Sequence, residues 1–235
     1  KVPEGSFGVS DVARVMGEDV LIRPMHVGQQ SQITQPMTLS EFAEYFHECT
    51  KPGQAILNMI SLEFSDTPLR GLVTSPSTVR EVDWIERCWP KDRKGARAHF
   101  KVVVQYYCLM SQGGSYTDFH LDFGGTSVWY HVLCGRKEFL LIPPTKKNLE
   151  LYEEWITSPT QGQVFFGDQV DECYRRGLVV QAGETLLIPS GWIHAVFTPL
   201  PSLVFGGNFL HSLNIPMQLQ IHNLELRAKI HPKFR

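Results

Sequence analysis

One short stretch decides the fold and the chemistry of this chain: Tyr116-Thr117-Asp118-Phe119-His120-Leu121-Asp122-Phe123-Gly124-Gly125. Aromatic and β-branched residues followed by two glycines are typical of a strand that ends in a turn. Successive side chains of a strand point to opposite faces, so His120 and Asp122 are expected to point the same way. A His-x-Asp pair can supply two ligands to a metal ion, although such a tripeptide also arises by chance in many chains.

A third ligand is available far downstream, in the run Gly191-Trp192-Ile193-His194-Ala195-Val196. If this run is a strand that returns across a barrel, His194 meets His120 and Asp122 around one metal ion. Two neutral nitrogens and one carboxylate form the facial triad that leaves positions on Fe(II) open for a cosubstrate and dioxygen. A set of ligands without cysteine favours Fe(II) over structural zinc. We therefore predict that His120, Asp122 and His194 bind the metal and form the catalytic centre.

An anion site is predicted next to this centre. Lys137 lies on the strand that follows Trp129-Tyr130-His131, and a buried ammonium there requires an anionic partner. The distal carboxylate of 2-oxoglutarate is a natural one, with Thr117 and Tyr130 offering hydroxyl groups to it. In the alternative interpretation, Lys137 extends to solvent and both hydroxyls belong to ordinary strand residues.

Short apolar runs broken by Gly and Pro fill the chain from about residue 100 onward and predict an antiparallel sandwich or barrel. The expected strands are Lys101–Met110, Thr126–Leu133, Lys137–Ile142, Leu178–Gln181, Thr185–Pro189, Trp192–Thr198 and Ser202–Phe205.

Four helices are expected around these strands. Thr38-Leu39-Ser40-Glu41 matches a capping box at the head of the first. Thr78 is the predicted cap of the second, which runs through Cys88 until Pro90 stops it. An amphipathic helix over about Lys146–Ile156 is expected to lie on the sheet, and a last helix begins at Pro216.

Length and composition predict one large domain with a substantial core, since 43% of the 235 residues are hydrophobic. A net charge of −2 argues against binding nucleic acid through bulk positive charge. The five cysteines contain no C-x-x-C pair, which favours a reducing compartment. No run approaches the roughly 18 apolar residues that cross a bilayer, so no membrane partner is expected. Because the chain starts without methionine, we expect it to be a piece of a longer protein.

Five runs of this sequence, in the same order, resemble the JmjC-domain histone lysine demethylases. The resemblance is to the subgroup that includes the PHD-finger and the F-box/CXXC lysine demethylases, and it extends from about residue 55 to the end. It implies a mainly β fold with flanking helices, the double-stranded β-helix or cupin-like jelly roll. The runs are Asn58–Ser65, Tyr107–Ser111, Tyr116–Tyr130, Ile188–Val196 and Gly206–Ser212.

The resemblance also implies a division of the chain. Residues 1–99 would form a mixed α/β flank packed on the barrel, and residues 100–215 the JmjC core. Residues 216–235 would form a C-terminal helix that is truncated, because members of the family continue into further helices.

Site residues carry over from the family one by one. His120, Asp122 and His194 match its iron ligands, and Thr117 and Lys137 match its contacts to the carboxylate of 2-oxoglutarate. Tyr130 and Asn58 match positions that line the cosubstrate pocket. Tyr107 and Asn208 match positions beside the methylated lysine.

The implied activity is that of a dioxygenase that uses Fe(II), with 2-oxoglutarate and dioxygen as cosubstrates. It would remove methyl groups from mono- and dimethyl-lysine of histone H3 by N-methyl hydroxylation, with release of formaldehyde and succinate. Lysine 36 is one candidate substrate, and lysine 9 or 27 is the other. The alternatives are a catalytically silent chromatin-binding JmjC module and a protein hydroxylase.

The expected partner is a methylated histone H3 tail peptide in the nucleus. Further contacts with chromatin would come through domains absent from this chain, and no direct nucleic-acid binding is expected of this domain.

Overall fold

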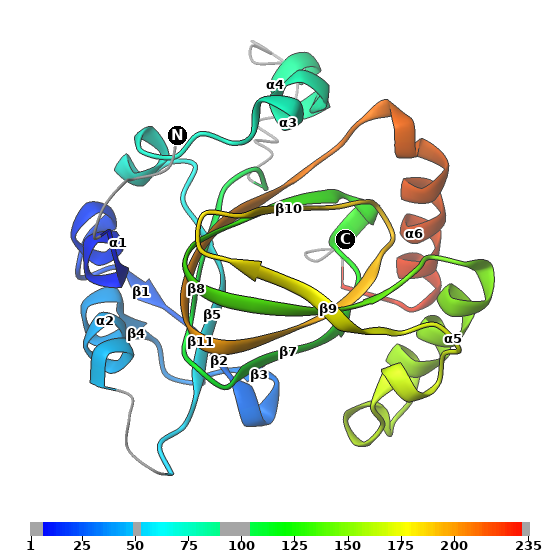
Figure 1. Cartoon of the computed structure of the whole chain (residues 1–235), viewed down its shortest axis with the longest axis horizontal. Coiled ribbons are helices and arrows are strands. Elements are labelled where there is room, and N and C mark those ends of the chain that lie inside the picture. The colour runs from blue at the N-terminus through cyan, green and yellow to red at the C-terminus, as the bar shows by residue number, and fades with distance from the viewer. Residues whose placement is uncertain (1–6, 49–52, 90–103, 232–235) are drawn as a thin grey trace.

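The computed structural model describes residues 7–48, 53–89 and 104–231, and it shows a β-barrel with helices on two sides of it (Figure 1). The strands are β1 (Leu21–Ile22), β2 (Met25–His26), β3 (Ser31–Gln32), β4 (Met37–Thr38), β5 (Leu57–Glu63), β6 (Tyr107–Ser111), β7 (Ser115–His120), β8 (Ser127–Ile142), β9 (Tyr174–Gln181), β10 (Thr185–Ile188) and β11 (Ile193–Phe209). The α-helices are α1 (Val9–Met16), α2 (Leu39–Glu48), α3 (Ser77–Val82), α4 (Trp84–Cys88), α5 (Lys146–Thr157) and α6 (Ile215–Arg227). No helix in these three ranges is long and apolar enough to span a bilayer.

Two long antiparallel strands, β8 and β11, build the barrel. They pair along almost their whole length, from Ile193 opposite Ile142 to Phe209 opposite Ser127. The register shifts three times between Phe197 and Val204, and such irregularities bend a strand and increase its twist. Each long strand therefore takes part in both walls of the barrel, as a jelly roll requires.

Different partners complete the two walls. In one wall, β10 pairs with the first part of β8, and β6 pairs with the last part of β11. In the other wall, β9 pairs with the last part of β8, and β7 pairs with the first part of β11. The N-terminal flank joins the first wall, because β5 pairs with β6 and extends the sheet through β2 to β3. The predicted mainly β jelly roll with flanking helices is confirmed.

The strands differ in number from the prediction. The expected runs Thr126–Leu133 and Lys137–Ile142 form the single strand β8, and Trp192–Thr198 and Ser202–Phe205 form the single strand β11. Prediction was wrong here because it divided the runs at Gly135 and Pro199-Leu200-Pro201, which the barrel accommodates as bends. Gly135 has φ of 84° and a Cβ there would lie 2.2 Å from the carbonyl of Pro201, so only glycine allows the strands to meet.

Three of the four helices agree with the prediction. The capping box at the head of α2 is formed, with Thr38 and Glu41 each accepting from the other's backbone N–H. α5 begins after Thr145, which caps it, and α6 carries Pro216 in its first turn. The expected helix from Thr78 to Cys88 was wrong, because Asp83 divides it into α3 and α4 and caps α4 through the N–H of Ile85.

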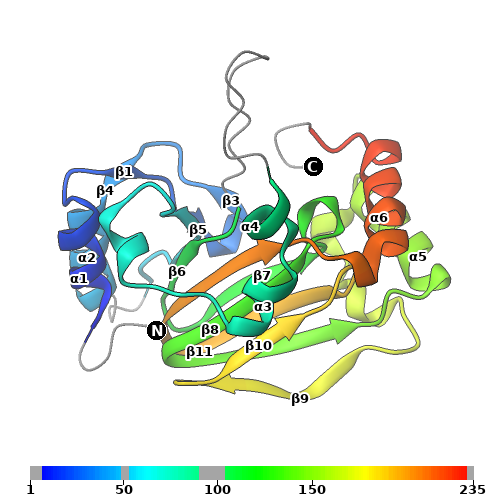
Figure 2. The ribbon, with the colours of Figure 1, turned by 90° about the horizontal axis from the view of Figure 1, so that it is seen from above.

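The helices flank the barrel on two sides. Figures 1 and 2 show α1 and α2 on one side and α5 and α6 on the other. One apolar cluster joins α1 and α2 to β5, β6 and β11, and a second joins α5 and α6 to β7 and β11. A third cluster lies between the walls and includes Tyr130 and Phe139. Pro90, Cys49, the first part of the run Lys101–Met110 and the predicted boundary at residues 99 and 100 lie outside the described residues.

Candidate active site

The two histidines of the predicted triad face each other across a pair of strands. His120 ends β7 and His194 stands near the start of β11, and the antiparallel register places the two residues opposite one another. Their ring centroids are 4.2 Å apart. The barrel thus brings together two residues that are 74 positions apart in the sequence.

Hydrogen bonds to the backbone orient both imidazoles. Nδ1 of His120 lies 2.8 Å from the carbonyl oxygen of Asp118, and Nδ1 of His194 lies 3.0 Å from that of Trp192. A carbonyl only accepts, so Nδ1 carries the hydrogen in each ring and the lone pair of the neutral imidazole is on Nε2. Bonds of this kind fix the tautomer of metal-binding histidines in many proteins.

Burial keeps His194 neutral. Its side chain is almost fully buried, and the pKa of the imidazole falls to about 4, mainly through loss of solvation and secondly through the neighbouring His120. A neutral imidazole is the form that binds a metal ion.

Asp122 completes the group, and Asn208 orients it. Nδ2 of Asn208 donates to Oδ1 of Asp122 over 3.1 Å and to the Thr126 hydroxyl over 2.8 Å. The other carboxylate oxygen, Oδ2, lies 3.8 Å from Nε2 of His194. Asn208, predicted to lie beside the methylated lysine, is therefore also in direct contact with a predicted metal ligand.

The donor chemistry suits a metal ion, and one pair of donors is close enough to share one. Nitrogen and oxygen donors lie at roughly 2.0–2.2 Å from such an ion, so two of them come within about 4.2 Å of each other. The 3.8 Å between His194 and Asp122 satisfies that limit. As they stand, however, no three His, Cys, Asp or Glu side chains in the described part of the chain form a group tight enough to hold a metal ion. The ligand assignment therefore stays a prediction.

Lys137 is buried rather than extended to solvent, with 2% of its surface exposed. Nζ donates to the hydroxyls of Ser111 and Thr198, over 2.6 and 2.8 Å. No salt bridge connects it to a carboxylate among residues 7–48, 53–89 and 104–231. Because burial of an unpaired charge is unfavourable, the pKa of Lys137 falls to about 7. An anion bound beside Lys137 would stabilise its charged form and offset the cost of burial.

Asn58, Thr117 and Tyr130 surround the same region. Nδ2 of Asn58 donates to Thr117 over 3.2 Å, and Oδ1 of Asn58 accepts from Ser111 over 2.7 Å. Tyr130 packs edge-on against Phe139 at 5.2 Å, and Phe139 in turn lies 6.3 Å from the ring of His194. Burial raises the pKa of the Tyr130 phenol, which therefore keeps its hydrogen.

Tyr107 lies at the edge of the site. The pKa of its phenol rises to about 12, mainly through burial and further through the charges of Glu63 and Asp122. The influence of Asp122 places Tyr107 within electrostatic reach of the predicted metal ligands.

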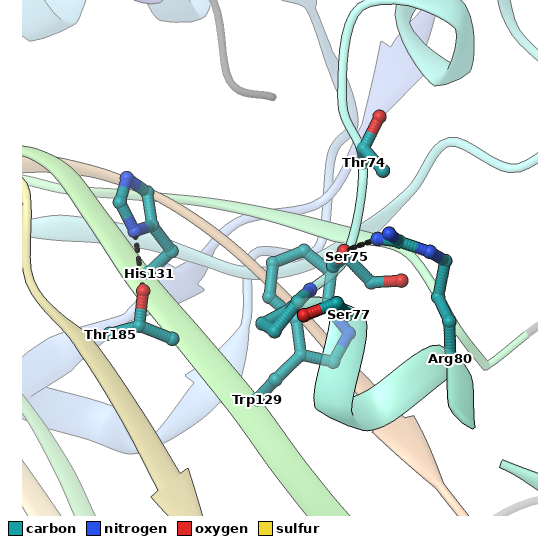
Figure 3. A pocket seen from close by; sticks show the side chains of 8 residues that line it. Thr74, Ser75, Ser77, Arg80, Trp129, His131 and Thr185 are labelled. Atoms are coloured by element: carbon teal, nitrogen blue, oxygen red, sulfur yellow. Dashed lines mark hydrogen bonds between the residues drawn. The ribbon is translucent and has the colours of Figure 1, made fainter. Parts of the chain in front are cut away.

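One cavity of about 400 Å³ lies outside this group (Figure 3). Its lining includes Trp129 and His131 of β8, and His131 bonds the Thr185 hydroxyl over 2.8 Å. Both residues flank Tyr130 and point to the opposite face of the strand. The structure thus places His131 outside the site.

Ser111 and Thr198 were missed by the sequence analysis, although a signal was present. Ser111 lies four residues after Tyr107 on β6, and Thr198 lies four residues after His194 on β11. Residues separated by an even number share a face of a strand, so both hydroxyls could have been placed on the inner face.

Comparison with known proteins agrees with this geometry. The family model described as "JmjC domain, hydroxylase" matches residues 107–209, the segment from β6 to β11 that contains the predicted triad.

Relatives match over the whole chain. The chain is 50% identical over 243 residues to lysine-specific demethylase 2A of Xenopus tropicalis and 50% identical over 236 residues to lysine-specific demethylase 7A of Danio rerio. It is also 50% identical over 234 residues to histone lysine demethylase PHF8 of Danio rerio. Each alignment covers 100% of this chain, but only 21%, 26% and 22% of the respective relative.

Proposed function

This chain belongs to the JmjC-domain family, and on that premise we propose that it is the catalytic domain of an Fe(II)- and 2-oxoglutarate-dependent histone lysine demethylase. The observation that carries the proposal is the pairing of His120 with His194, with Asp122 within 3.8 Å of the latter. The chain spans only about a quarter of the length of its relatives, so the activity of the whole protein is part of the proposal.

The proposed iron ligands are His120, Asp122 and His194. Nε2 of each imidazole provides a lone pair, because Nδ1 is held by a backbone carbonyl. Asn208 holds one oxygen of Asp122 and leaves the other directed at His194. When bound, iron and 2-oxoglutarate would supply the oxidising chemistry that hydroxylates an N-methyl group, after which formaldehyde is lost.

The proposed cosubstrate contacts are Lys137, Thr117, Tyr130 and Asn58. Lys137 supplies the charge that attracts the distal carboxylate of 2-oxoglutarate, and Thr117 and Tyr130 supply neutral donors. The unpaired burial of Lys137 supports this assignment more strongly than the sequence did, because the alternative of a solvated lysine does not fit a side chain with 2% exposure.

We propose mono- and dimethyl-lysine of histone H3 as the substrate, at lysine 36 or at lysine 9 or 27. Three of the similar proteins carry lysine demethylase in their names, and one name specifies histone. Tyr107 and Asn208 are the residues proposed to lie beside the methylated lysine. Residence in the nucleus and contacts with chromatin through other parts of a longer protein belong to the same proposal.

The test is incubation of the full chain with Fe(II), 2-oxoglutarate and oxygen, using H3 peptides methylated at one lysine at a time. Mass spectrometry of the peptides gives the result. Loss of a methylene mass together with formaldehyde supports demethylation. A stable gain of one oxygen mass shows a protein hydroxylase instead, and unchanged peptides with every substrate support a silent chromatin-binding module.

A further inference from the structure

Five strands contribute to one chain of hydrogen bonds inside the barrel. Lys137 of β8 bonds Ser111 of β6 and Thr198 of β11, Ser111 bonds Asn58 of β5, and Asn58 bonds Thr117 of β7. All distances lie between 2.6 and 3.2 Å. The proposed function uses Lys137, Thr117 and Asn58 but gives no role to Ser111 and Thr198.

The direction of each bond in this chain follows from Lys137. A protonated lysine only donates, so both hydroxyls accept from Nζ. Ser111 therefore directs its own hydrogen to Oδ1 of Asn58, and Nδ2 of Asn58 donates to Oγ1 of Thr117. The hydrogen of the Thr117 hydroxyl is then available to another acceptor.

Lys137 retains donor capacity as well. An ammonium has three N–H bonds, and in the part of the chain that the structure describes two of them are directed at Ser111 and Thr198. The side chain is buried, so the third N–H has little access to bulk water. One ammonium hydrogen and one hydroxyl hydrogen therefore remain for an acceptor outside this network.

We propose that Ser111 and Thr198 are positioning residues for the cosubstrate, which hold the Lys137 ammonium so that it and the Thr117 hydroxyl donate to one carboxylate. The inference rests on the proposed function, because that carboxylate is the distal one of 2-oxoglutarate. Ser111 acts on both donors, since it anchors Lys137 directly and orients Thr117 through Asn58.

If the hydroxyls of Ser111 and Thr198 had only a structural role, removing either would have the same effect as removing any other buried hydroxyl of the barrel. The chain offers a matched control for that case. Ser115 is fully buried on β7 opposite Thr198, and its hydroxyl has no hydrogen-bond partner among the described residues. Ser115→Ala therefore removes a buried hydroxyl from the same wall without touching the proposed network.

The experiment compares Ser111→Ala and Thr198→Val with Ser115→Ala and with the conservative variant Thr198→Ser. The dissociation constant of 2-oxoglutarate is measured by titration calorimetry on the full chain loaded with Mn(II) in the absence of oxygen and peptide. The KM values for 2-oxoglutarate and for peptide, kcat, and the melting temperature are measured in parallel.

We expect Ser111→Ala and Thr198→Val to weaken 2-oxoglutarate binding about tenfold, the effect of losing one charge-assisted hydrogen bond. The peptide KM, and kcat at saturating 2-oxoglutarate, should stay within about twofold of the wild type. Thr198→Ser and Ser115→Ala should bind 2-oxoglutarate like the wild type.

The inference is overturned if Ser111→Ala and Thr198→Val bind 2-oxoglutarate as tightly as Ser115→Ala. It is also overturned if 2-oxoglutarate binding weakens, the peptide KM rises, and kcat and the melting temperature fall together, because that pattern indicates a general loss of structure. Failure of the proposed function is a separate result: the wild type would then modify no peptide, while calorimetry would still compare the variants.

Discussion

His120 and His194 each make a hydrogen bond to the backbone carbonyl of the residue two positions earlier. In both cases the bond fixes the hydrogen on Nδ1 and leaves the lone pair on Nε2. The same local arrangement on two separate strands is what the proposed shared metal centre requires.

His194→Ala should reduce turnover by more than the roughly 10–100-fold that loss of a residue bonded only to a ligand costs. Removal of His194 deletes one of three proposed ligands, so iron affinity measured by equilibrium dialysis should fall in parallel. His131→Ala is the control, since His131 bonds Thr185 outside the site. Near-full activity of His194→Ala would refute the ligand assignment.

Lys137 determines a pH dependence of stability in the absence of cosubstrate. Burial lowers its pKa from the ordinary 10.5 to about 7. Between these values the unfolded chain binds a proton that the folded chain lacks, so the free energy of unfolding rises with pH. Below the lower value both states are protonated, and the unfavourable burial of the charge is fully present.

Lys137→Met should remove this dependence. Relative to the variant, the wild type should gain up to roughly 1.4 kcal/mol per pH unit from about pH 7 to about pH 10. Urea unfolding of both proteins at several pH values measures the difference. Parallel stability curves for the two proteins would show that Lys137 does not carry the shift.

At the scale of elements, α6 supports the loop that contains Asp122. Oε1 of Glu225 accepts from the N–H of Gly124 over 2.8 Å. A Cβ at Gly125 would lie 2.8 Å from Cα of Gln218, so this loop and the helix meet backbone to backbone. The C-terminal helix, predicted from the family as a truncated element, therefore lies against the loop that follows a proposed metal ligand.

Gly125→Ala should destabilise the protein by about 2–4 kcal/mol and weaken iron binding. The change combines a left-handed φ of 61° with a collision against α6. Gly124→Ala is the matched control: its φ of 58° is equally unfavourable, but nothing lies within 4 Å of a new Cβ, so about 1–2 kcal/mol is expected. Thermal unfolding and iron titration of both variants measure the difference, and equal losses would show that contact with α6 is unimportant.

For the molecule as a whole, the proposed site joins strands from both walls of the barrel. β7, the turn after it and β11 supply the proposed metal ligands, while β5, β6, β7, β8 and β11 supply the anion side. Binding of metal and 2-oxoglutarate should therefore stabilise the entire barrel rather than one loop.

In the absence of oxygen, 2-oxoglutarate at about 100 times its own dissociation constant should stabilise the Mn(II)-loaded wild type by about 2.7 kcal/mol beyond the effect of the metal. For a chain of this length that corresponds to roughly 5–10 °C in melting temperature. Lys137→Met should show only the increase that the metal alone produces. If 2-oxoglutarate raised the melting temperature of both proteins equally in calorimetry, Lys137 would not contribute to its binding.

The sequence by itself determined the strand character, three of the four helices and the family. These features are local, because they follow from alternation, capping residues and short motifs. It did not determine that β8 and β11 continue through their bends. Glycine and proline usually end a strand, and only the pairing of each strand with its long neighbour shows that β8 and β11 continue.

Only the tertiary structure brought His194 opposite His120 and showed Lys137 to be buried between Ser111 and Thr198. Both facts depend on register between strands far apart in the sequence. A shift of one residue would turn either side chain to the other face of its strand, and no local pattern records which register the closed barrel selects.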